Sequence, residues 1–270
     1  MSVNEIHGFK LLAAAAFMMA AGASAQSSDG IPRAPDGHPD LSGTWDNGAG
    51  IGFVQPRQDG DSICIFGCGG APPVAGAAAP GAPPPPVGPK YRPQFTARVA
   101  DLDARQVQED PVLRCFAPGV PRIGPPDKIV QRAGEVAFLY EDVSGSFFRV
   151  VPTDGRAHPT NNEPSYLGDA VGHWEGDTLV VETRNFNDLT WLTDNGAFHT
   201  TGLRVVERLR RTADTLEWEA TAQDPAVLAE PWQVAKRVAQ RTDIEIVESP
   251  PCIDRSLDHM VDDSHHTNPR

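Results

Sequence analysis

Apolar and polar residues alternate with a period of two along much of the chain beyond residue 128. In the segment 202–211, Leu203, Val205 and Leu209 occupy alternate positions with Glu207 between the last two, and charged residues fill most of the intervening positions. A strand with one buried face shows this period because successive side chains point to opposite sides. The pattern predicts a fold in which each strand has one face in a core.

Short turn signals separate these strands and predict hairpins. The segments 133–134, 175–177 and 213–214 each lie between two apolar-rich stretches, as tight turns do. The predicted strands cover residues 128–131, 135–141, 146–151, 170–174, 178–183, 202–211, 215–221 and 232–240. Because most of them follow one another without a helical pattern between, we expect a mainly β fold, an antiparallel up-and-down meander closing into a β-barrel. An open β-sandwich is the alternative.

Composition divides the chain into five parts. We expect a signal peptide at 1–25, an N-terminal extension with the first strand at 26–68, a Pro/Ala/Gly-rich linker at 69–93, the β-barrel domain at 94–256 and a polar disordered tail at 257–270. The barrel domain begins with one predicted helix over residues 94–109, in which Phe95, Val99, Leu102 and Val107 lie near one face.

The N-terminus has the pattern of an export signal. An apolar run follows Lys10, and Ala23-Ser24-Ala25 forms a small-x-small cleavage site. The alternative, an uncleaved anchor, lacks a following stop-transfer pattern. We therefore expect a periplasmic or secreted protein with no integral membrane segment after cleavage. Its formal net charge of −13 argues against nucleic acid as a partner, because an acidic surface repels phosphates.

The chain has four cysteines, an even number that favours two disulfides in an exported protein. Of the three possible connectivities we favour Cys64–Cys68 and Cys115–Cys252, the second tying the start of the β region to its end. The competing interpretation of Cys64 and Cys68 is a metal site. No histidine or second cysteine pair lies nearby at zinc spacing, so we predict no metal and no other cofactor.

A polar cluster between residues 149 and 173 contains the groups best suited to chemistry. Imidazoles transfer protons near neutral pH and carboxylates orient them, so His158 or His173 could act as a base with Asp154 or Asp169 as its orienter. The structural interpretation is that Asp154 only shapes a β-turn and that His173 is satisfied by a hydrogen bond in the core.

A second set of residues in the same half of the chain suggests ligand binding. Arg149, Arg156 and Tyr166 could anchor a ligand, and Trp191, among Asp and Asn in a predicted loop, could stack on a ring or cover the barrel mouth. The charged pair Glu207-Arg208 is expected at the solvated edge of its strand.

Two stretches resemble known families. Gly43-Thr44-Trp45 is similar to the Gly-x-Trp opening of lipocalin-type barrels, and the resemblance implies a lipocalin-like barrel whose closed end is plugged by the Trp. The stretch 172–183, GHWEGDTLVVET, resembles a family of exported, mostly uncharacterised bacterial β-rich proteins, and the likeness extends over much of residues 112–252. That family implies no known chemistry.

The sequence therefore supports two hypotheses. The first is an exported lipocalin-like protein that binds a small amphipathic or aromatic ligand in a barrel pocket. The second is a periplasmic isomerase, lyase or hydrolase that uses a His/Asp pair without a cofactor. Binding is favoured because no Gly-x-Ser-x-Gly, His-Glu-x-x-His, P-loop or dinucleotide motif is present in the sequence.

Overall fold

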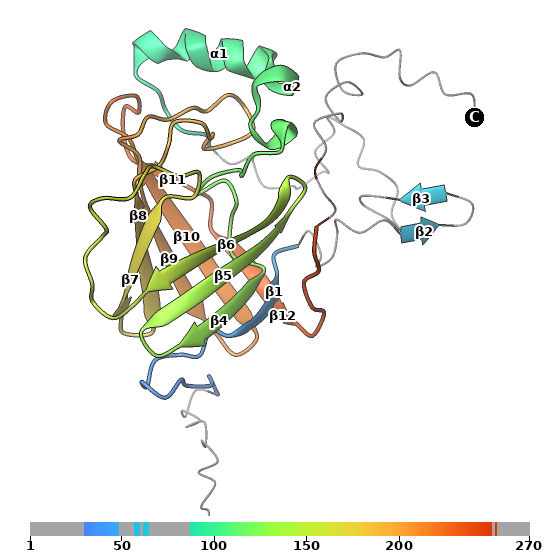
Figure 1. The fold of residues 1–270 in the computed structure, drawn as a ribbon, viewed down its shortest axis with the longest axis vertical. Helices are drawn as coiled ribbons and strands as arrows, with labels where there is room; N and C mark the ends of the chain where they lie inside the picture. Colours follow the sequence, from blue (N-terminus) through green and yellow to red (C-terminus); the bar gives the residue numbers. More distant parts are fainter. Residues whose placement is uncertain (1–29, 49–56, 60–61, 65–86, 250–251, 253–270) are drawn as a thin grey trace, which may run out of the picture.

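Most strands belong to one antiparallel sheet that curls into a nearly closed barrel. The computed structural model describes residues 30–48, 57–59, 62–64, 87–249 and 252. In the sheet the strands follow the order β6-β5-β4-β1-β12-β10-β9-β8-β7, and β11 pairs with β10 (Figure 1). The strands are β1 (Gly43–Asp46), β4 (Lys128–Arg132), β5 (Glu135–Asp142), β6 (Gly145–Pro152), β7 (Asp169–Glu175), β8 (Thr178–Arg184), β9 (Arg204–Arg211), β10 (Thr215–Gln223), β11 (Trp232–Gln233) and β12 (Arg237–Thr242), with a separate hairpin of β2 (Arg57–Asp59) and β3 (Ser62–Cys64).

The predicted mainly β meander is confirmed, with one interruption between β6 and β7. Eight antiparallel pairings connect β6 to β7 around the barrel, so these two edge strands run in the same direction. Two parallel neighbours cannot be joined by a tight hairpin. The segment 153–168 instead returns from the end of β6 to the start of β7, and the two edges form no ladder of hydrogen bonds.

The seam between the two edges is tight at one end only. A Cβ at Gly172 of β7 would lie 3.0 Å from Val151 Cγ1 and 3.1 Å from Thr153 Cγ2, so the end of β6 packs directly against β7 there. Nearer the start of each strand, the side chains of Phe148 and Ala170 line a pocket. The barrel is therefore closed by packing at one end of the seam and open at the other.

The barrel interior is filled by large apolar side chains from most of the strands. Trp45, Phe138, Leu179, Leu209 and Trp218 are fully buried. Trp45 lies on β1, which pairs with both β4 and β12, so the strand predicted within the N-terminal extension belongs to the barrel. The strict alternation of buried positions in β9 and β10 agrees with the pattern in the sequence.

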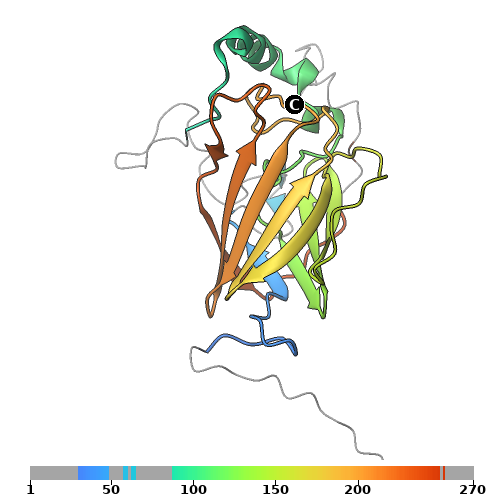
Figure 2. The same cartoon turned by 90° about the vertical axis from the view of Figure 1, so that its left-hand side faces the viewer.

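The helical segment lies over one end of the barrel, opposite the end where residues 30–42 enter β1 (Figure 1 and Figure 2). The predicted single helix is divided. A 3₁₀ turn, η1 (Pro93–Phe95), leads into α1 (Thr96–Ala104), and α2 (Gln106–Glu109) follows after Arg105, whose φ of −115° and ψ of 27° are not helical. A 3₁₀ turn, η2 (Val112–Arg114), ends at Cys115. None of the helices in the described ranges has the length and apolar character needed to cross a bilayer.

The C-terminal segment is fixed to the outside of the barrel. The backbone N–H of Ser249 donates to Ser146 Oγ over 3.0 Å, and the N–H of Val247 donates to the Glu141 carboxylate. The predicted Cys115–Cys252 disulfide is present, with the two Cα atoms 5.5 Å apart. The predicted strand at 232–240 is divided into β11 and β12.

Candidate functional site

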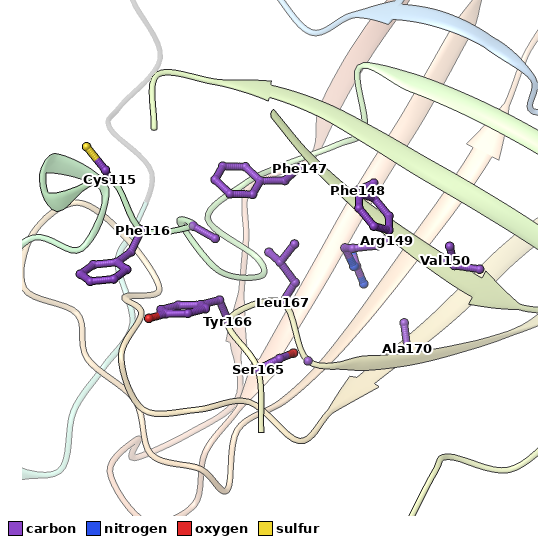
Figure 3. Close-up of a pocket in the computed structure, with 12 residues that line it drawn as sticks. Cys115, Phe116, Phe147, Phe148, Arg149, Val150, Ser165, Tyr166, Leu167 and Ala170 are labelled. Carbon is purple, nitrogen blue, oxygen red and sulfur yellow. The ribbon is translucent and has the colours of Figure 1, made fainter. Parts of the chain in front are cut away.

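The open end of the seam forms a pocket of about 490 Å³. Three parts of the chain line it: the segment after η2, the middle of β6 and the end of the crossover with the start of β7 (Figure 3). The lining residues are Cys115, Phe116, Ala117, Phe147, Phe148, Arg149, Val150, Ser165, Tyr166, Leu167, Gly168 and Ala170. The volume is within the usual range for small-molecule sites, and the lining is apolar apart from a few polar groups, as such sites are.

Aromatic rings form the rim of the pocket. The rings of Phe116 and Tyr166 stack with centroids 5.5 Å apart and an interplanar angle of 13°. Phe148 is 69 % exposed although it projects from the middle of a strand, and Phe116 is 42 % exposed. Exposed aromatic rings around a concavity are typical of a surface that another molecule covers.

Arg149 is the charged residue of the pocket, and its guanidinium is held by a buried network. The Nη2 group donates to Glu207 Oε2 over 2.6 Å and to Thr183 Oγ1 over 2.7 Å. The Nη1 group donates to Tyr140 Oη over 3.1 Å, and Trp218 Nε1 donates to the second oxygen of Glu207 over 3.1 Å. Both charges are buried, so the ion pair needs these additional hydrogen bonds to offset its desolvation.

The network keeps Arg149 positively charged and leaves one donor free. Burial alone would lower the pKa of Arg149, but the Glu207 carboxylate and the Tyr140 hydroxyl more than offset this and raise the pKa above its usual value. Burial raises the pKa of the Tyr140 hydroxyl, which therefore stays neutral. The buried Nε of Arg149 has no hydrogen-bond partner among the described residues.

Gly168 and the side-chain amides of Asn162 and Asn185 hold the wall of the pocket that faces β6 in position. Gly168 has φ +67°, and a Cβ there would lie 2.5 Å from the carbonyl oxygen of Arg184. At the next residue, the Asp169 carboxylate accepts from Asn185 Nδ2 over 2.7 Å and from Asn162 Nδ2 over 3.1 Å. These contacts fix the crossover against the end of β8, and so set the distance between Leu167 and β6.

The predicted ligand-binding residues lie in different places. Arg149 and Tyr166 line the pocket. Arg156 lies outside the pocket lining, in an exposed turn, where it pairs with the carboxylate of Asp154. Trp191 is 5 % exposed and forms an isolated β-bridge with Phe198 beneath the helical segment, so it is a core residue of the loop that precedes β9.

The four residues predicted to catalyse do not form the expected pair. His173 is exposed and its Nε2 lies 3.3 Å from Glu175 Oε1, whereas His158 Nε2 lies 3.2 Å from Glu182 Oε1. Hydrogen bonding to Arg156 lowers the pKa of Asp154 to about 2, and Asp169 is held by the two amides. Within the described ranges, no hydrogen bond or ion pair joins two of these four residues, and none of them lines the pocket.

Sequence reasoning missed the key partner of Arg149. The expectation that Glu207 lies at a solvated edge is wrong, because its side chain is fully buried. The signal was its position: Glu207 shares the buried face with Val205 and Leu209. The aromatic lining residues Phe116, Phe147 and Phe148 were also missed, because the β6 sequence alone does not show that this strand is an edge.

Cys64 lies in β3, and Cys68 is outside the described residues, so the proposed Cys64–Cys68 disulfide stays a prediction. In the described ranges, no group of three or more His, Cys, Asp or Glu side chains is arranged to hold a metal ion. No protein-family model matches the chain, and no match was found among curated proteins.

Proposed function

We propose that this protein is an exported, lipocalin-like binding protein that holds a small, mostly apolar or aromatic molecule in the β6–β7 pocket. The observation that carries the proposal is the exposed aromatic lining around a buried arginine. Exposure of apolar side chains to water is unfavourable. A ligand that covers them removes this apolar surface from water, and the burial stabilises the complex. The pocket also lies at an interruption of the barrel, so a ligand can enter from the side.

Export to the periplasm or beyond fits the same picture. The protein contains the Cys115–Cys252 disulfide. Disulfides persist in oxidising compartments and are rare in cytosolic proteins. Binding is favoured over catalysis because the candidate acid–base residues His158 and His173 lie outside the pocket lining. The pocket lining itself contains no histidine or carboxylate that could act as a general base.

A neutral fluorescent dye, N-phenyl-1-naphthylamine, tests the proposal. We expect saturable binding at one site, with enhanced dye fluorescence. Ala170 packs against the core and lines the pocket, so Ala170→Phe should fill the space and reduce dye affinity at least tenfold. Val238→Phe adds similar bulk at an exposed position on β12, outside the pocket lining, and should leave binding unchanged. Equal dye affinity in the wild-type protein and Ala170→Phe would contradict the assignment of this pocket.

A further inference from the structure

Arg149 lines the pocket, and one of its buried donors has no acceptor in the described part of the chain. Arg149 is 5 % exposed, and its Nη1 and Nη2 groups are engaged by Tyr140, Thr183 and Glu207, while the buried Nε has no partner among the described residues. A buried donor without an acceptor is costly, since it has given up its hydrogen bonds to water. In Figure 3 the side chain of Arg149 points from β6 towards the side of the pocket that carries Ala170.

The charge of Arg149 is already balanced. Glu207 Oε2 lies 2.6 Å from Nη2, and both side chains are almost wholly excluded from solvent. An anionic ligand would meet a neutral pair and the nearby carboxylate of Glu207, and it would lose its own hydration on entry. The net charge of −13 adds long-range repulsion of anions. An uncharged acceptor pays much less for desolvation and still satisfies the Nε–H group.

We propose that the ligand of this pocket is a neutral, ring-containing molecule that presents one uncharged acceptor oxygen, such as a ketone carbonyl, to Nε of Arg149. This inference rests on the proposed binding function and specifies its ligand class. The stacked rings of Phe116 and Tyr166, together with Phe147 and Phe148, contact the ring system, and Arg149 sets its orientation. A carboxylate of the same shape is rejected.

Three probes that share a naphthalene ring distinguish a neutral acceptor, an anion and a purely apolar ligand. They are the ketone 2-acetylnaphthalene, the carboxylate 2-naphthoate and the hydrocarbon 2-ethylnaphthalene. Each is titrated against the wild-type protein loaded with N-phenyl-1-naphthylamine, and displacement of the dye is measured. We expect the ketone to displace the dye at a concentration at least tenfold lower than the hydrocarbon or the carboxylate. Tightest binding by the carboxylate would overturn the inference, as would equal binding of ketone and hydrocarbon. Absence of dye binding to the wild-type protein would instead refute the binding function itself.

A double variant tests whether Arg149 is the donor. Arg149→Met/Glu207→Gln removes both charges together, so neither is left buried alone, and the glutamine carbonyl still accepts from Trp218 Nε1. The variant should lose the tenfold preference for the ketone over the hydrocarbon. A retained tenfold preference would show that another group donates. The ranking of the three probes in the wild-type protein decides the ligand class even if this variant does not fold.

Discussion

Asp127 is a buried carboxyl group that lies directly before β4, near other acidic residues. Its Oδ2 accepts from the backbone N–H of Glu141 over 2.8 Å, and its Oδ1 accepts from Asn47 Nδ2 over 3.2 Å. The pKa of Asp127 is raised from 3.8 to about 7, mainly by burial; the backbone hydrogen bond opposes the rise, and the nearby carboxylates of Glu141, Asp142 and Asp46 add to it. The folded protein therefore binds a proton at Asp127 that the unfolded chain releases at much lower pH.

The raised pKa of Asp127 predicts that its contribution to stability falls as pH rises from about 4 to 7. In that range the folded state binds more protons than the unfolded state, so the free energy of unfolding decreases with pH. The loss approaches about 4 kcal/mol at pH 7 and above, from roughly 1.4 kcal/mol per pKa unit. Asp127→Asn keeps a side-chain acceptor and removes the titration. Urea unfolding of both proteins at pH 4 and pH 8 should show the variant gaining stability relative to the wild type at pH 8. A difference that does not change with pH would contradict the prediction.

Among single residues, the sequence was sufficient to predict some members of the candidate site but not others, because it does not show which residues meet across the barrel. Arg149 and Tyr166 were selected as ligand anchors, and both line the pocket. Glu207 was placed at the surface because a charged residue is rarely buried without a partner, and its partner lies 58 residues away on β6. Alternation alone shows that Glu207 faces inward, but only the closed sheet shows which cation it meets.

Among the elements, the crossover between β6 and β7 determines whether the barrel has a pocket. Its last residues are held on the β8 side, since Ser165 donates from its N–H to Asn185 O over 3.1 Å and Gly168 packs on the carbonyl oxygen of Arg184. The crossover therefore widens the seam on the side where the pocket lies. A segment of the same length that paired with β6 instead would close the seam.

Gly168 and Gly155 provide a matched pair of substitutions within this crossover. Both have positive φ, +67° and +83°, so alanine at either position costs about 1 kcal/mol of backbone strain. A Cβ at Gly155 meets nothing within 4 Å, whereas one at Gly168 would lie 2.5 Å from Arg184 O and 2.8 Å from Thr183 Cγ2.

We therefore expect Gly168→Ala to lower the free energy of unfolding by about 3 kcal/mol in total and to weaken dye binding, because overpacking adds to the strain. Gly155→Ala should lose only the strain and bind dye normally. Thermal unfolding and dye titration measure both effects, and equal losses in the two variants would argue against a positioning role for Gly168.

The hairpins were predictable from the sequence, whereas the crossover was not. The turns at 133–134 and 175–177 connect strands of opposite direction, so local turn chemistry and alternation were sufficient. The break at Arg105 that divides the helix, and the division of the predicted last strand into β11 and β12, were not predicted by the periodicity of apolar residues. The parallel relation of β6 and β7 depends on the number of strands in the whole circuit, which no local window contains.

Across the whole molecule, the C-terminal segment connects the last strand to the rim of the pocket. After β12 the chain passes the β5–β6 hairpin, where Ser249 and Ser146 exchange hydrogen bonds. It then reaches Cys115 through the disulfide from Cys252, and Cys115 lies next to Phe116 in the pocket lining. The same covalent bond therefore restrains the unfolded chain and fixes part of the binding site.

The Cys115–Cys252 bond spans 137 residues, so its removal should cost stability and affinity together. Closing so long a loop lowers the entropy of the unfolded chain, and we expect Cys115→Ser/Cys252→Ser to lose about 2–5 kcal/mol of unfolding free energy. Serine substitution is preferred to a reducing agent because it leaves Cys64 and Cys68 unchanged. Without the bond, Phe116 is less firmly positioned against Tyr166, so affinity for N-phenyl-1-naphthylamine should also decrease.

The two effects are separated by titrating dye well below the melting temperature of the variant, with Val238→Phe as a substitution remote from both the pocket and the disulfide. A variant that loses stability but binds dye as tightly as the wild type would show that the disulfide stabilises the fold without shaping the pocket, whereas unchanged stability would contradict the loop-entropy argument.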